Sequence, residues 1–130
     1  MSSSGPDIPP PLHEVEAEVM EEVWRLGEAT VRDVLAALNE HSDKQRAYTT
    51  IMTVLARLER KGILERRKEG KGFVYAPRAT REDYLEARAE AAVEALVDEF
   101  GEVALVNFAK QMSKIDGPRR EQLRRLARRG

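Results

Sequence analysis

The residues best able to do chemistry in this sequence are threonines and cations gathered within residues 44–71. Short hydroxyl groups and long cationic side chains can hydrogen-bond phosphate oxygens and the edges of nucleic-acid bases. The candidates for such contacts, with one tyrosine among them, are Lys44, Arg46, Tyr48, Thr49, Thr50, Thr53, Arg57, Arg60, Arg67, Lys68 and Lys71. The pattern therefore indicates a surface that binds phosphate and bases.

The near-neutral total charge conceals this segregation. The net charge is −1, yet in residues 12–41 only Arg25 and Arg32 are basic, whereas residues 44–78 are strongly basic. A segregated basic face on a neutral protein is the footprint expected for phosphate binding. A charge run by itself is more often a solvated surface. The elements that carry the charges must decide between the two.

Enzyme chemistry has little support. There are no cysteines, and the two histidines, His13 and His41, lack a plausible third ligand at metal spacing. The "EGKG" of residues 69–72 lacks the spacing of a phosphate-binding P-loop. We expect no enzyme, no cofactor and no metal.

Three helices are predicted to position the basic residues. Apolar residues recur about one turn apart in residues 13–26, which predicts a first helix that Gly27 terminates. Thr30 is placed to cap a second helix, and a third helix covers residues 47–61 before Gly62. After Gly62 the period changes, and "ILERRK" and "FVYAP" flank a glycine-containing turn, as in a β-hairpin.

This order, three helices and then a basic hairpin, is that of a winged helix-turn-helix, so we predict a mainly α fold with a small β wing (α+β). On a helical wheel, one side of the third helix collects Tyr48, Ile51, Val54, Leu55 and Leu58. The other side collects Arg46, Thr49, Thr50, Thr53, Arg57 and Arg60. These threonines could belong to an indifferent solvated face, but the helix order and the basic hairpin favour a recognition helix that enters a DNA groove.

Further helices are predicted for residues 80–100 and 102–114, with a short last one after Gly117 and Pro118. Their apolar faces could pack on the winged helix, but they are extensive enough to favour a homodimer. The candidate interface residues are Leu85, Ala92, Leu96, Phe100, Leu105, Phe108 and Met112. We thus expect a disordered leader (1–11), a DNA-binding domain (12–79) and a helical dimerisation domain (80–130).

The string "AYTTIMTVLARLERKGILERRKEGKGFVYAP" resembles the hallmark of the BlaI/MecI penicillinase-repressor family, and "LHEVEAEVMEEVWRLGEATVRDVLAALNE" is similar to the family's first two helices. The resemblance covers residues 12 to about 126. It implies a repressor that dimerises through its C-terminal helices and binds an inverted-repeat operator with TACA/TGTA-type cores. The pair Asn107 and Phe108 matches the bond that is cut in antibiotic-responsive members, downstream of a membrane sensor with a zinc protease domain. Phe108 is equally well explained as a dimer-core residue.

Two features depart from the family. The tail "GPRREQLRRLARRG" is more basic than expected, and the paired C-terminal cysteines of a copper-responsive branch are missing, which argues against metal sensing. No run approaches the roughly 20 apolar residues of a membrane span, so we expect a cytoplasmic protein without direct membrane binding. The rival interpretations are a winged helix that binds an acidic protein partner and a non-specific DNA-binding protein.

Overall fold

A computed structural model describes residues 9–41 and 43–129 of the 130-residue chain. The chain divides into two compact units, Met1–Ala89 and Glu90–Gly130. Most of the predicted leader, residues 1–8, lies outside the described residues. Its end is held by the first unit, because the carbonyl oxygens of Pro9 and Pro10 accept hydrogen bonds from Arg88 (3.2 Å) and Tyr84 (2.6 Å).

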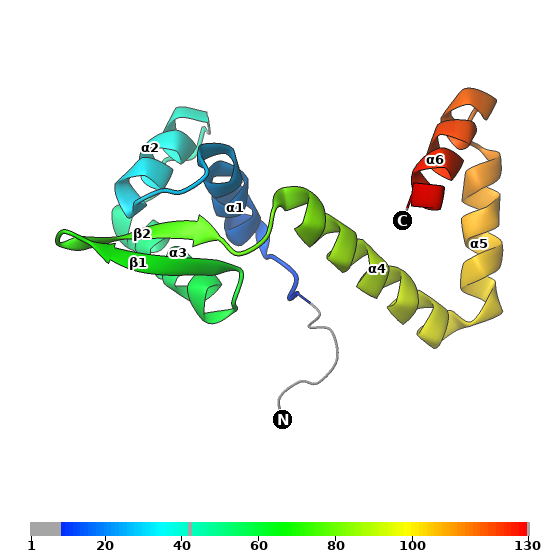
Figure 1. The fold of residues 1–130 in the computed structure, drawn as a ribbon, viewed down its shortest axis with the longest axis horizontal. Helices are drawn as coiled ribbons and strands as arrows, with labels where there is room; N and C mark the ends of the chain where they lie inside the picture. The colour runs from blue at the N-terminus through cyan, green and yellow to red at the C-terminus, as the bar shows by residue number, and fades with distance from the viewer. Residues whose placement is uncertain (1–8, 42, 130) are drawn as a thin grey trace. The chain divides into compact units, whose positions relative to one another are not determined.

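The first unit is a winged helix (Figure 1). Helices α1 (Glu14–Leu26), α2 (Val31–His41) and α3 (Tyr48–Arg60) precede an antiparallel hairpin of β1 (Leu64–Glu69) and β2 (Gly72–Pro77). We call this hairpin the wing. Helix α4 (Arg81–Phe100) begins directly after it. The predicted fold class is confirmed, and the predicted boundaries hold to within a residue or so for these elements.

Local sequence explains where the helices begin. The Thr30 hydroxyl accepts a hydrogen bond from the amide of Asp33 at 3.1 Å, and the Asp33 carboxylate accepts one from the amide of Thr30 at 3.0 Å. This reciprocal capping box satisfies two amides that the first turn leaves without partners. Thr80 begins α4 in a related way, accepting a 3.0 Å bond from the amide of Asp83.

The core of the first unit joins the inner faces of the helices to the base of the wing. Its fully buried side chains include Met20 of α1, Ile51, Leu55 and Leu58 of α3, and Leu64 of β1. The prediction that Tyr48 also lies inside is wrong, because its side chain is 40% exposed. A side chain on a helix lies over the turn N-terminal to its own Cα, and Tyr48 is the first residue of α3, so its ring extends beyond the core. There it lies 5.4 Å from the guanidinium carbon of Arg32.

The wing is attached to the helices along one edge. Its register runs from Leu64 opposite Pro77 to Glu69 opposite Gly72. Tyr75 exchanges backbone hydrogen bonds of 2.8 and 2.9 Å with Ala29, in the loop between α1 and α2. This bridge pairs part of the free edge of β2 and fixes the root of the wing.

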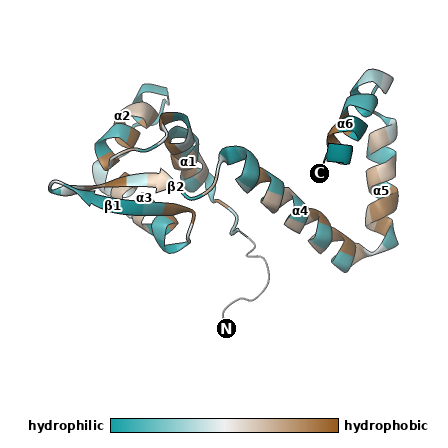
Figure 2. Ribbon diagram, viewed as in Figure 1, coloured by the Kyte–Doolittle hydropathy of each residue, from teal (hydrophilic) through white to brown (hydrophobic). Residues whose placement is uncertain are grey.

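The second unit contains the end of α4, then α5 (Glu102–Ser113) and α6 (Gly117–Arg129). Gly101 joins α4 to α5 with φ 61° and ψ −136°, a conformation that other residues rarely adopt. Among residues 90–129 only Ala104 is buried. Apolar residues recur along α4 and α5 in Figure 2, and large ones such as Val103 (62% exposed) lie open. The functional boundary between residues 79 and 80 stays a prediction.

Among the helices of residues 9–41 and 43–129, none combines the length and the apolar character that crossing a membrane requires.

Candidate nucleic-acid interface

The outward side of α3 carries the predicted base-reading residues. Thr49, Thr50 and Thr53, which we call the threonine face, are all exposed. Together with Val15, Val54 and Arg57 they line an open groove of about 390 Å³. Short hydroxyl-bearing side chains permit close approach and can bond a phosphate or base edge, so this face suits contact with a DNA groove.

Two arginines extend the threonine face toward the end of α3. Arg60 is exposed, and the side chain of Arg57 is 45% exposed. The Nη1 atom of Arg57 lies 3.8 Å from a carboxylate oxygen of Glu16, a residue of α1 that is only 1% exposed. Arg57 is therefore available to a ligand on one side and lies within electrostatic reach of a buried carboxylate on the other.

Arg46, just before α3, is already engaged within the protein. Its Nη2 atom donates a 2.9 Å hydrogen bond to Glu18, and its side chain is 19% exposed. The backbone amide of Arg46 donates to Asn39 at 2.7 Å, and the Asn39 side chain donates back to its carbonyl oxygen at 3.3 Å. These contacts tie the start of α3 to α1 and α2. Lys44, earlier in the same loop, is exposed.

The predicted wing contacts fall into two groups. Lys68 and Lys71 are exposed. Arg67 is exposed too, but its Nη2 atom lies 2.7 Å from Glu28 and 3.3 Å from Glu69. Hydrogen bonds with Glu28, the stronger influence, and with Glu69 raise the pKa of Arg67. The hydrogen bond between Arg67 and Glu28 also lowers the pKa of Glu28. Arg67 thus differs from its neighbours in having its charge balanced.

Arg66 is a wing cation absent from the predicted contacts. Its guanidinium carbon lies 4.1 Å from the centre of the Phe73 ring, and Lys68 Nζ lies 5.6 Å from the same centre. Alternation along a strand places residues 66 and 68 on one face, and Lys68 is opposite Phe73 in the register. The two-residue alternation of a β-strand, visible in the sequence, could therefore have identified Arg66 as a neighbour of Lys68 on the same face.

Most of the predicted dimer-interface residues are exposed to solvent. Among the large side chains, the exposed fractions are 43% for Leu85, 41% for Leu96, 51% for Phe100 and 53% for Leu105. Ala92 is also exposed, whereas Phe108 and Met112 are half-buried. At the predicted cleavage site, Asn107 is exposed, and its side-chain amide donates a 2.9 Å bond to the carbonyl oxygen of Val103.

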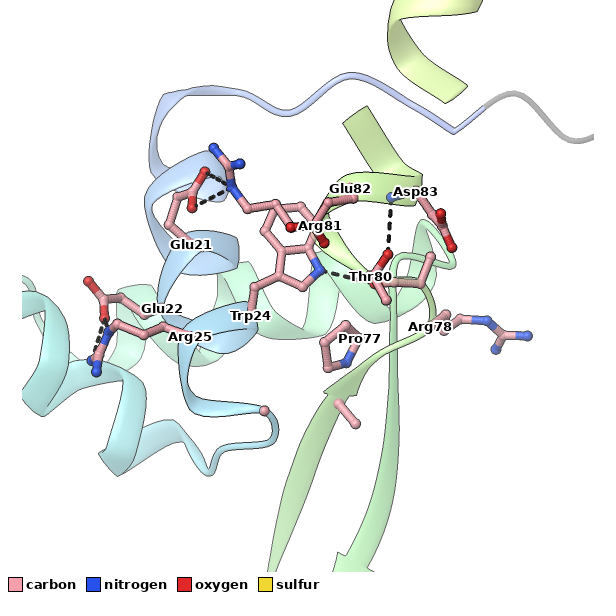
Figure 3. A pocket seen from close by; sticks show the side chains of 13 residues that line it. Glu21, Glu22, Trp24, Arg25, Pro77, Arg78, Thr80, Arg81, Glu82 and Asp83 are labelled. Atoms are coloured by element: carbon pink, nitrogen blue, oxygen red, sulfur yellow. Dashed lines mark hydrogen bonds and ion pairs between the residues drawn. The ribbon is translucent and has the colours of Figure 1, made fainter. Parts of the chain in front are cut away.

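A further cleft, which the sequence did not indicate, lies between the end of α1, the end of β2 and the start of α4 (Figure 3). It measures about 930 Å³ and is lined by both acidic and basic side chains. The Trp24 indole donates a 3.0 Å bond to the carbonyl oxygen of Ala79, and Arg81 donates a 2.9 Å bond to Glu21. The Trp24 and Tyr84 rings lie 5.5 Å apart. These contacts fix the first turns of α4 on the winged helix.

Comparison with known proteins places this geometry in a family. Residues 12–129 match the family model described as penicillinase repressor. The penicillinase repressor of Bacillus licheniformis is 35% identical over 79 residues, which cover 61% of this chain and 60% of that protein. The chain thus matches less than two thirds of that relative's length. The transcriptional regulator BlaI of Mycobacterium tuberculosis is 33% identical over 103 residues, covering 78% of this chain and 73% of that one.

The winged helix also has a structural counterpart. The solution structure of the DNA-binding domain of the repressor BlaI is 36% identical, with a TM-score of 0.51, and the similarity covers 60% of this chain and 92% of that one. The match to the family model extends beyond this domain to nearly the end of the chain. This protein belongs to the penicillinase repressor family.

Proposed function

We propose that this protein is a transcriptional repressor that binds double-stranded DNA as a homodimer. The observation that carries the proposal is the groove lined by the threonine face and Arg57 on the outward side of α3. The relatives support it, since one is named a penicillinase repressor and another is the DNA-binding domain of the repressor BlaI. Since the proposed action is on DNA, we also propose a cytoplasmic location.

In the proposed complex α3 enters the major groove. The hydroxyl and methyl groups of Thr49, Thr50 and Thr53 contact base edges and thymine methyls, and Arg57 and Arg60 reach a guanine edge or the flanking phosphates. Lys68 and Lys71 of the wing neutralise phosphates and so fix the register without reading sequence. Repression follows because a protein bound over a promoter excludes other proteins from it.

Dimerisation would follow from the second unit. Leu96 and Phe100 of α4 and Leu105 of α5 are too exposed for apolar residues with no partner. Burying them between two copies sets two copies of α3 on one duplex, so we propose an inverted-repeat operator. Once one protomer is bound, its partner meets the second half-site at a high effective concentration, so the dimer binds the operator far more tightly than a monomer binds one half-site.

Cleavage between Asn107 and Phe108 would release the operator. Asn107 is exposed on α5, as access by a protease requires, and Phe108 belongs to the proposed interface. Cutting there would remove apolar burial and turn one two-headed binder into two weaker ones. A membrane sensor protease acting upstream is the proposed source of the signal.

Selection of bound duplexes from a random pool, repeated at two salt concentrations, tests the function. We expect recovery of an inverted repeat that survives at the higher salt. Recovery of unenriched DNA that dissociates at moderate salt would leave only non-specific electrostatic binding. Failure to retain any duplex would favour the alternative, a winged helix that binds an acidic protein.

A further inference from the structure

Glu16 is the one charged residue that is buried among residues 9–41 and 43–129. Its carboxylate accepts hydrogen bonds from Lys61 Nζ at 2.8 and 2.9 Å and from the amide of His13 at 2.9 Å. A buried ion is stable only when such partners replace the water it has lost. Burial by itself would raise the pKa of Glu16, but the His13 amide and Lys61 outweigh it and hold the pKa below its ordinary value. Glu16 therefore carries a negative charge at neutral pH.

This charge lies directly behind the proposed DNA-reading surface. Lys61 caps the C-terminal end of α3, and Arg57 lies one turn earlier, so both cations face the start of α1. Arg57 Nη1 is 3.8 Å from Glu16 Oε2, while Arg57 also lines the groove beside the threonine face. Arg57 is thus the residue that links the buried carboxylate to the groove.

A second carboxylate of α1 makes a similar contact near the N-terminal end of α3. Glu18, two residues after Glu16 on α1, bonds Arg46 just before α3 begins. Carboxylates of α1 therefore hold both ends of α3, at Arg46 and at Lys61. These two ion pairs add electrostatic contacts at both ends of α3 to the apolar packing of its inner face.

We propose that Glu16 is a positioning residue that sets the sequence preference of α3 by holding Arg57 at the groove. This inference rests on the proposed DNA-binding function. A free arginine can reach any nearby phosphate, which adds affinity without discrimination. An arginine attracted by a fixed carboxylate 3.8 Å away is biased toward one geometry, which favours one base edge over others.

Glu16→Gln tests the proposal, because it removes the charge and keeps the shape of the side chain. The full chain is compared with Glu16→Gln, Arg57→Ala and the double variant, on the selected operator and on a scrambled duplex of equal length. We expect Glu16→Gln to lower the ratio of operator to scrambled affinity about tenfold. For the scrambled duplex, we expect the log-log salt slope to steepen by up to about 0.9 as Arg57 becomes free to bind phosphate. The double variant should lose no more preference than Arg57→Ala alone, because the two residues act through one contact.

Lys61→Gln is the matched control. It breaks the same buried ion pair and should cost at least as much stability, because it leaves the Glu16 charge without its closest cation, but it keeps Glu16 beside Arg57. We expect it to keep the operator preference, with circular dichroism showing that the helices persist. An equal loss of preference in Lys61→Gln and Glu16→Gln would mean that the effect is one of stability, and would overturn the proposal.

Two other outcomes are decisive. If Glu16→Gln does not fold, Glu16→Asp keeps the charge but withdraws it from Arg57, and it should show the same loss of preference. An unchanged preference in whichever of these variants folds overturns the inference while leaving the proposed function intact. A wild-type chain that does not distinguish operator from scrambled DNA overturns the function, and the inference with it.

Discussion

Neighbouring cations of the wing should contribute unequally to DNA binding. Arg67 lies 2.7 Å from Glu28 and 3.3 Å from Glu69, whereas Lys68 makes no ion pair within the described residues. A phosphate must displace two carboxylates to reach Arg67, but only water to reach Lys68. We therefore predict that Lys68→Ala weakens non-specific DNA binding and that Arg67→Ala leaves it nearly unchanged.

The size of the effect follows from counterion release. Each phosphate contact contributes about 0.9 to the log-log salt slope, so Lys68→Ala should reduce the slope by about 0.9 per bound protomer. Between about 50 and 200 mM salt, one such contact accounts for a change of about 3.5-fold in affinity. Arg67→Ala should leave the slope at its wild-type value. Glu28→Gln should steepen it by up to about 0.9, because it frees Arg67 for phosphate.

Fluorescence anisotropy of a labelled duplex of unrelated sequence, titrated over a series of salt concentrations, measures these slopes. Using unrelated DNA removes base contacts from the comparison, and circular dichroism checks that each variant retains its helices. If Arg67→Ala flattens the slope as much as Lys68→Ala does, the ion pairs do not withhold Arg67 from DNA. The assignment of separate roles to the neighbouring cations would then be refuted.

Other predictions concern assembly and stability. Leu96→Asp should yield monomers in sedimentation equilibrium, because Leu96 is 41% exposed and a charge there opposes burial between two copies. The control Ala95→Asp, at another position around α4, should remain dimeric. If Leu96→Asp is also dimeric, the interface lies elsewhere. The lowered pKa of Glu16 stabilises the fold above about pH 4.5, the ordinary value, and this contribution is lost as the pH falls through the lowered one. Urea unfolding across this range should show a larger loss in wild-type protein than in Glu16→Gln, where only other carboxylates with a lowered pKa, such as Glu28, still contribute; identical profiles would contradict the role of Glu16. Gly101→Ala should cost about 1–3 kcal/mol in urea unfolding because of its positive φ, whereas Gly117→Ala, at the first residue of α6, should cost nothing; equal effects would count against backbone strain.

Much of the fold could be predicted from local sequence. The period of apolar residues located the helices, and the change of period after Gly62 located the wing, because buried side chains must recur with the geometry of their backbone. The cap at Thr30 and the break at Gly101 were equally local, since each depends on bonds or angles within a few residues. The helical wheel wrongly predicted that Tyr48 is buried, because Tyr48 lies at the end of α3, where neighbouring elements no longer cover every inward position.

The sequence by itself determined that the chain carries a basic, threonine-bearing helix and a basic wing. It could not distinguish one cation from another, since Arg46, Arg57, Lys61, Arg67 and Lys68 are equivalent in a count of charge. Tertiary structure decided their states by bringing up partners that are distant in sequence: Glu18 lies 28 residues from Arg46, Glu28 lies 39 from Arg67, and Glu16 lies 45 from Lys61. The physical reason is that charges interact over a few ångströms, and only the packing of the helices and the wing determines which carboxylate comes that close.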